Sequence, residues 1–216
     1  MIALTADQVD SRHTPDRVAA AIARIDALAD GRLVRAPERT AGDELQCLAD
    51  SASAIVEIAL DLAAIGEWRV GIGIGDVEEP LPPSVREVRG EALVLAREAL
   101  DGVKRRTGPA NALAVRVGAG RLPSGDAIQA FADLLLDLRA RRTRGGRELA
   151  VLLGRGLSRS EAAAELGLTP QAVSARSKAA GLELDARARA GLVELLDLAA
   201  GRPDVGGDDQ NAGHDD

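Results

Sequence analysis

Short apolar runs divide the first part of the chain into strands separated by polar segments. Two of these runs, Leu33–Thr40 and Glu44–Leu48, are joined by Ala41-Gly42-Asp43, which predicts a β-hairpin. Pro37 limits regular pairing within its first strand. Three further runs have the length and composition of buried strands: Ile2–Ala6, Trp68–Ile74 and Leu113–Val117.

Apolar residues at helical spacing predict four helices among these strands, at about 14–29, 51–65, 90–105 and 124–139. Thr14 is the expected cap of the first helix, and Asp50 or Ser51 that of the second. The order is therefore βαββαβ followed by αβα. This order predicts an α/β (α+β) fold with a ferredoxin-like sheet, one extra unit and helices covering one face.

The segment 157–180, LSRSEAAAELGLTPQAVSARSKAA, has the pattern of a helix-turn-helix. Ser158 or Ser160 would cap the first helix, and Gly167 would end it in a conformation with positive φ. Thr169 would cap the second helix, with Pro170 at its first position, where a missing N–H has no cost. An ordinary helical hairpin in an alanine-rich protein is the alternative.

The second helix of this pair would turn Val173 inward and leave a polar face outward. Recognition helices present such a face to base edges and phosphates, so the pattern predicts binding of duplex DNA. The expected contact residues are Thr169, Gln171, Ser174 and Lys178, with Arg176 and Arg159 directed toward phosphates. The segment resembles the helix-turn-helix of bacterial sigma-factor region 4, which implies a way of reading DNA and no particular target.

Charge separates the chain into parts. Residues 139–202 contain 12 Lys and Arg against 7 Asp and Glu, whereas residues 1–138 contain 15 against 22. A basic module within an acidic chain is suited to the phosphate backbone. We expect an α/β domain at 1–139, a linker at 140–146, a small all-α helix-turn-helix domain at 147–201 and a disordered acidic tail at 202–216.

Composition excludes several other classes of protein. A single cysteine, Cys47, excludes an intramolecular disulfide and any multi-cysteine metal site. The only aromatic residues are Trp68 and Phe131, too few for base stacking by a single-strand binder. No apolar run approaches the ~20 residues of a membrane span. We therefore expect a cytoplasmic protein with no membrane partner.

Two acidic residues stand where the predicted topology would bring them together. Asp7 follows the first strand, and Asp43 lies at the tip of the hairpin, with Asp10 and Glu44 nearby. Two carboxylates at neighbouring strand ends can share one Mg²⁺ ion, the metal of phosphoryl and nucleotidyl transfer. The alternative is that both are ordinary residues of turns.

Four motifs resemble the SatD family of bacterial proteins: ADQVDSR at 6–12, GDELQ at 42–46, GIGIG at 71–75 and GEALVLAREAL at 90–100. The strings RVGIGIG and TAGDELQ are also similar to class III nucleotide cyclases. These resemblances imply a nucleotide cyclase-like palm domain, with Asp7 and Asp43 as metal ligands and Arg39 and Arg97 as nucleotide-binding residues.

The cyclase resemblance breaks at the helix that would stabilise the transition state. Cyclases present Asn and, four residues later, Arg from this helix. When this chain is aligned with the cyclases at Gly90, Val94 and Glu98 occupy those two positions. When it is aligned at Arg97, Leu93 occupies the Asn position. The groups that stabilise developing phosphate charge are thus incomplete, which argues against an active cyclase.

The sequence therefore predicts a DNA-binding transcriptional regulator with a sensing or dimerising cyclase-like domain and a possible nucleotide effector. A homodimer is expected, because one recognition helix reads few base pairs. The alternative is a metal-dependent nucleotide-processing enzyme localised by its helix-turn-helix. A third possibility is an interaction module whose helical domain docks a protein.

Overall fold

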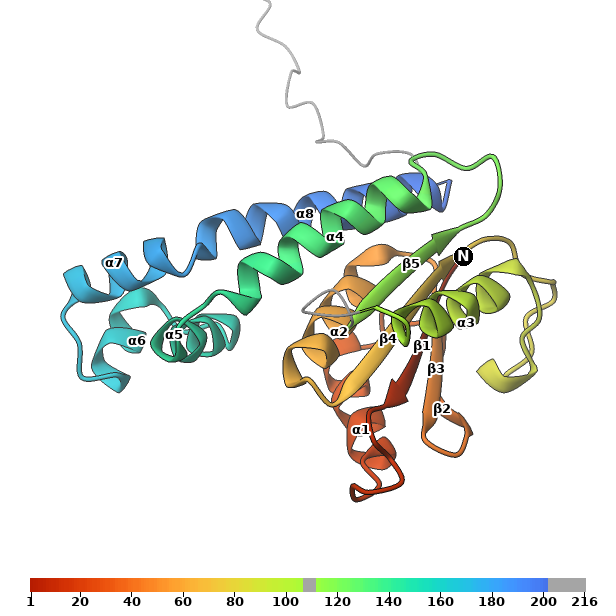
Figure 1. Ribbon diagram of the computed structural model, residues 1–216, viewed down its shortest axis with the longest axis horizontal. Helices are drawn as coiled ribbons and strands as arrows, with labels where there is room; N and C mark the ends of the chain where they lie inside the picture. Colours follow the sequence, from red (N-terminus) through yellow and green to blue (C-terminus); the bar gives the residue numbers. More distant parts are fainter. Residues whose placement is uncertain (107–111, 202–216) are drawn as a thin grey trace, which may run out of the picture.

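The computed structural model describes residues 1–106 and 112–201. The expected acidic tail, 202–216, lies outside the described residues. An α/β body and a helical lobe make up the described chain, and two long helices, α4 and α8, run side by side from one to the other (Figure 1).

A five-stranded sheet forms the centre of the body. Its order is β2-β3-β1-β4-β5; β4 and β5 are parallel, and every other neighbouring pair is antiparallel. The first four strands thus have the ferredoxin-like order, and the expected mixed α/β class is confirmed. The strands are β1 (Ile2–Gln8), β2 (Arg35–Ala41), β3 (Glu44–Ala49), β4 (Trp68–Ile74) and β5 (Leu113–Val117).

Helices cover both faces of the sheet, whereas the sequence had suggested one. Helices α1 (Val18–Ala29) and α2 (Ala52–Ile65) share the main hydrophobic core with one side of β1, β3 and β4. Helix α3 (Glu91–Val103) packs on the other side, with a short 3₁₀ turn, η1 (Val85–Glu87), beside it. The expectation of one covered face was wrong because α3 connects the parallel strands β4 and β5 across the opposite side.

Two glycines of β4 allow α3 to lie this close to the sheet. A Cβ at Gly73 would stand 2.1 Å from the carbonyl oxygen of Ala92 and 2.2 Å from the amide nitrogen of Ala96. A Cβ at Gly71 would meet the same helix one turn later, 2.2 Å from the carbonyl oxygen of Ala96. The glycine series therefore serves helix packing, as its place within a strand predicts.

The starts of α1 and α2 differ from the expected caps. Thr14 does not cap α1; its hydroxyl donates to the carbonyl of Asp10, and the amide of Val18 donates instead to Asp16 Oδ1 at 2.9 Å. Ser51 precedes α2, but its side chain makes no cap hydrogen bond. The amide of Ala52 donates to Asp197 Oδ1 at 2.8 Å, so an acid from the far end of the chain occupies the cap position.

After β5, every regular element of the described chain is a helix. These helices are α4 (Gly125–Ala140), α5 (Arg144–Gly154), α6 (Arg159–Glu165), α7 (Pro170–Ala179) and α8 (Leu182–Ala199). Thr143 caps α5, which begins inside the segment 140–146 that had been expected to be a linker. Helix α8 returns to the body, where Leu192, Leu196 and Ala199 are buried in the main core.

Candidate functional site

Helices α6 and α7 are joined by the four residues 166–169, and both helices are capped as the sequence predicts. The Ser158 hydroxyl accepts from the amide of Glu161 at 3.2 Å, and Glu161 Oε2 accepts from the amide of Ser158 at 2.7 Å, which is a capping box. This exchange holds the pKa of the Glu161 carboxyl below its ordinary value. Thr169 Oγ1 accepts from the amide of Ala172 at 3.2 Å.

A small hydrophobic cluster fixes the angle between these helices. Val173 of α7 is fully buried, as expected, and packs with Ala162 and Ala163 of α6. Leu149 and Leu152 of α5 complete the cluster. Alanine side chains at the contact let the two helix backbones approach closely, so α5, α6 and α7 form one packed unit.

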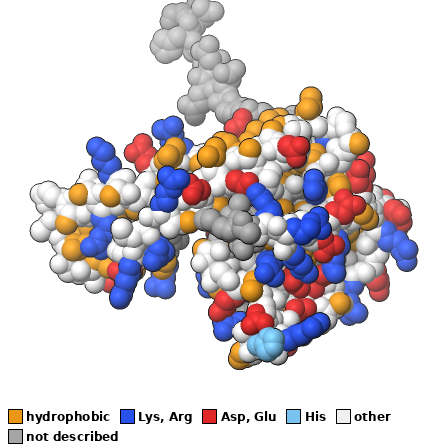
Figure 2. All heavy atoms as spheres, viewed as in Figure 1, with side chains coloured by type: hydrophobic (Ala, Val, Ile, Leu, Met, Phe, Trp, Pro, Cys, Tyr) orange, Lys and Arg blue, Asp and Glu red, His pale blue; other side chains and the backbone are white. Residues whose placement is uncertain are grey.

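The outward face of α7 is polar. Thr169, Gln171, Ser174 and Lys178 are exposed. Arg176 is half-buried, and its guanidinium lies against Gly145 of α5. Arg159 is exposed at the start of α6. Lys and Arg side chains project from the helical lobe in Figure 2.

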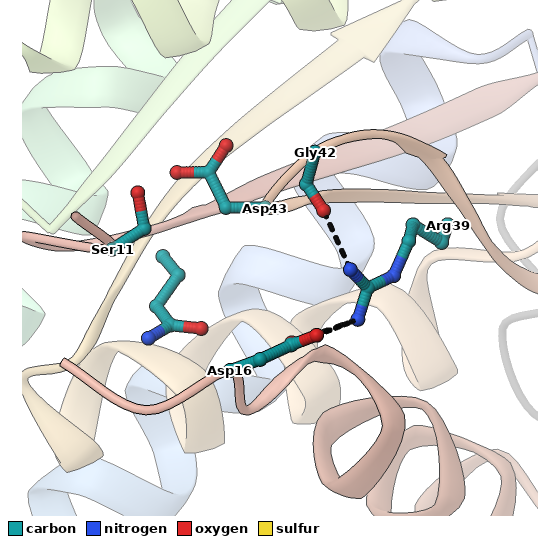
Figure 3. A pocket seen from close by; sticks show the side chains of 6 residues that line it. Ser11, Asp16, Arg39, Gly42 and Asp43 are labelled. Atoms are coloured by element: carbon teal, nitrogen blue, oxygen red, sulfur yellow. Dashed lines mark hydrogen bonds and ion pairs between the residues drawn. The ribbon is translucent and has the colours of Figure 1, made fainter.

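A second candidate site lies in the body, where the β2–β3 hairpin meets the loop after β1. Figure 3 shows side chains from both segments converging there. The open cavity has a volume of about 270 Å³. It is lined by Gln8, Ser11, Asp16, Arg39, Gly42 and Asp43.

Arg39 connects the two walls of this cavity. Its Nη1 donates to the carbonyl of Gly42 at 2.7 Å, and its Nη2 contacts both carboxylate oxygens of Asp16 at 2.7 and 2.6 Å (Figure 3). The hydrogen bonds from Arg39 and from the amide of Val18 hold the pKa of Asp16 below its ordinary value. The cavity therefore presents a guanidinium that is already paired, beside the carboxylate of Asp43.

The four residues expected to hold metal and nucleotide fall into two groups. Arg39 and Asp43 line the cavity. Asp7 is outside that lining; its carboxylate lies 3.2 Å from Nζ of Lys104. Arg97 pairs with Glu44, whose side chain is buried.

The register of the sheet explains this division. Asp7 pairs with Glu44 across β1 and β3, so these two side chains share a face of the sheet, the one that α3 covers. Within residues 1–106 and 112–201, no three His, Cys, Asp or Glu side chains are grouped as a metal ion would require. Mg²⁺ shared by Asp7 and Asp43 would have to displace Lys104 from Asp7.

Three residues that line the cavity were not anticipated. Gln8 and Asp16 hold the loop between β1 and α1: Gln8 Oε1 accepts from the amide of Arg17 at 2.9 Å, and Asp16 accepts from Val18. Ser11 lies in the same loop. The available signal for Gln8 was its place directly after Asp7 at the end of β1.

The chain was compared with known proteins. No family model matches it, and no curated protein matches it. Among solved structures, the chain is similar to one described as a bacterial light-regulated adenylyl cyclase, with 15% sequence identity and a TM-score of 0.37; the match covers 53% of this chain and 74% of that one. Membership of the SatD family stays a prediction from sequence motifs.

None of the helices in the described part of the chain combines the length and the apolar character that crossing a bilayer requires.

Proposed function

We propose that this protein is a DNA-binding transcriptional regulator in which α6 and α7 form a helix-turn-helix and α7 is the recognition helix. The observation that carries the proposal is the polar, exposed face of α7 on a helix pair fixed by Val173. A helix that enters the major groove needs such a face and a rigid support behind it. The proposal places the protein in the cytoplasm, with the genome.

The side chains on α7 suit two kinds of contact. The carboxamide of Gln171 can hydrogen-bond to adenine through N6 and N7, which reads sequence. Lys178 carries a point charge suited to phosphate, as does Arg159 at the start of α6. The wider lobe supports this: residues 141–181 contain eight Lys and Arg against three Asp and Glu.

In this proposal the α/β body is the sensing domain. The cavity combines the guanidinium of Arg39, the two carboxylates of Asp16 and Asp43 and two neutral polar side chains, a set of hydrogen-bonding groups suited to a small polar effector such as a nucleotide. Helices α4 and α8 connect that body to the helical lobe, so they are the elements through which an effector bound in the body would act on α7.

Genome-wide mapping of bound DNA, repeated after nucleotide depletion, tests the proposal. We expect discrete bound sites whose occupancy over the rest of the genome falls in Gln171→Ala and changes on nucleotide depletion. Absence of site-specific occupancy in the wild type would refute the regulator.

A second candidate is a metal-dependent nucleotide-processing enzyme localised by its helix-turn-helix. The position of Asp43 in an open cavity favours it. The pairing of Asp7 with Lys104 counts against it, because the other carboxylate of the predicted metal pair is then bound to a lysine. Mg²⁺-dependent nucleotide turnover by the wild type that is lost in Asp43→Asn would favour the enzyme, and no turnover by the wild type would remove it.

A further inference from the structure

The pair of helices α4 and α8 has an outward face that carries large apolar side chains in solvent. Leu134 of α4 is 72% exposed, and Leu184 and Leu198 of α8 are 52% and 40% exposed. Figure 2 shows hydrophobic side chains along the edge of the molecule where these two helices lie. Apolar groups collected on one face, rather than scattered singly, indicate a contact surface.

On α8 these residues belong to one stripe. Leu184, Arg187, Gly191, Glu194 and Leu198 follow each other at intervals of three or four residues, which places them on one side of a helix. The opposite side of α8, which includes Leu192 and Leu196, is buried in the main core. The stripe is therefore directed away from the body, and it is called the α8 stripe below.

Gly191 is the centre of the α8 stripe, and α8 has little bulk there. Ala190 beside it is exposed. The nearest group of α4 is the ring of Phe131, which would stand 3.5 Å from a Cβ at position 191. Phe131 thus occupies the side of Gly191 that faces α4, and the small, exposed Ala190 leaves room for another helix to approach α8 from the solvent side.

The α8 stripe is complementary to itself when two copies are antiparallel. A two-fold axis through Gly191 places Leu184, seven residues before it, opposite Leu198 of the partner subunit, seven residues after it. Arg187, four residues before, then lies beside Glu194 of the partner subunit, three residues after. A two-fold axis makes each contact twice, so both apolar and both charged pairs are satisfied.

The charges of Arg187 and Glu194 support this pairing because both side chains are available to bind the partner subunit. Arg187 and Glu194 are exposed, and neither forms an ion pair with another residue in the described ranges. Arg189, by contrast, is already paired, since its Nε lies 3.2 Å from Oδ2 of Asp185 on the same helix.

We propose that the outward face of α4 and α8 binds the same face of a second copy of this chain, with the two α8 helices antiparallel about Gly191. The inference rests on the proposed DNA-binding regulator, for which the sequence predicts a homodimer, and it gives that dimer an interface. The occupant is another copy because the charges and leucines of the α8 stripe match each other under a two-fold rotation.

Charge reversal tests the pairing with little risk to folding, since both charged side chains are exposed. Sedimentation equilibrium of the full chain should show a dimer for the wild type. Arg187→Glu and Glu194→Arg should each weaken dimerisation by about tenfold or more, and the double reversal should restore it. Circular dichroism should be unchanged in all three variants, and so should thermal unfolding at concentrations low enough for every protein to be monomeric.

Two matched substitutions of exposed apolar residues test whether the dimer uses this face rather than the outer face of α3. Leu184→Glu should give monomers, whereas Val94→Glu, at a side chain that is 57% exposed on α3, should leave the dimer intact. A disulfide supplies a second readout. Cys47 is buried, so Ala190→Cys, at an exposed position beside Gly191, should cross-link two chains near the axis on oxidation, and Val94→Cys should not.

Three results would overturn the proposal: a wild type that stays monomeric throughout the concentration series, a double reversal that remains as weak as its single variants, or dissociation by Val94→Glu alone. DNA binding is measured separately on the same proteins. If the protein forms this dimer but does not bind DNA, the interface is supported and the proposed function is refuted. If the protein binds DNA as a monomer, the proposed function is supported and the interface is refuted.

Discussion

Asp185, near the start of α8, accepts two hydrogen bonds from Arg139, near the end of α4, from Nε at 2.5 Å and from Nη2 at 3.0 Å. Arg142 Nη2 lies 2.8 Å from the same carboxylate, and Arg142 Nε donates to the carbonyl of Ala180 just after α7. The side chains of Asp185 and Arg142 are only 7% and 8% exposed. This ion cluster joins the helical lobe to the two long helices that reach the body.

Replacing Asp185 with Ala should lower the free energy of unfolding by about 3–5 kcal/mol, because the substitution leaves buried guanidinium groups without their counter-charge. Urea unfolding followed by circular dichroism measures this. The control is Asp137→Ala, which breaks the exposed pair with Arg141 on the same helix and should cost less than about 1 kcal/mol. Equal losses in the two variants would contradict the role given to the cluster.

The same cluster should make the free energy of unfolding depend on pH in the acid range. Burial by itself raises the pKa of Asp185, but the hydrogen bonds and charges of Arg139 and Arg142 outweigh it and hold the pKa below its ordinary value. A carboxyl group whose pKa is lowered by folding stabilises the protein at pH values above its pKa in the unfolded chain, about 3.9. This stabilisation is lost as the pH falls through its pKa in the folded protein. Unfolding free energies measured below about pH 4 should fall more steeply in wild type than in Asp185→Asn.

Gly73→Ala should destabilise the protein by about 3 kcal/mol or more, since its Cβ would overlap backbone atoms of α3 that cannot move aside independently. Gly102→Ala, within α3 itself, is the matched control. A Cβ there meets nothing within 4 Å, so this change should stabilise the helix by about 0.5–1 kcal/mol. Urea midpoints of the two variants should therefore move in opposite directions.

Arg39→Ala should reduce nucleotide binding by about tenfold while changing stability by less than about 1 kcal/mol, because its ion pair with Asp16 is exposed. Isothermal titration with ATP and GTP, with and without Mg²⁺, measures the first effect, and thermal unfolding measures the second. Arg97→Ala serves as the comparison, since Arg97 pairs with Glu44 outside the cavity lining. Binding that is unchanged in Arg39→Ala would remove the cavity as the effector site.

Local signals predicted much of this structure. The apolar runs that end at Ile74 and Val117 coincide with β4 and β5, and the caps at Ser158 and Thr169 were readable because each acts within three residues of itself.

The rest depends on contacts between distant parts of the chain. The sequence gives no local reason for Asp197 to cap α2 or for Leu196 to enter the main core, since both depend on the return of α8. Pairing of Asp7 with Lys104 and of Glu44 with Arg97 was missed for the same reason. In the register of β1 and β3, Asp7 lies opposite Glu44. Side chains of successive residues point to opposite faces of a sheet, so Asp43 is not expected on the same face as Asp7.

The central claim is that α7 reads duplex DNA, and fluorescence anisotropy with the full chain tests it most directly. Binding would be titrated on a mapped site and on a scrambled duplex across a salt series. Gln171→Ala should lose about 1–3 kcal/mol of preference for the mapped site, whereas Lys178→Ala should weaken both duplexes evenly and reduce the salt slope by about one. Equal, salt-independent binding by wild type and both variants would contradict the account.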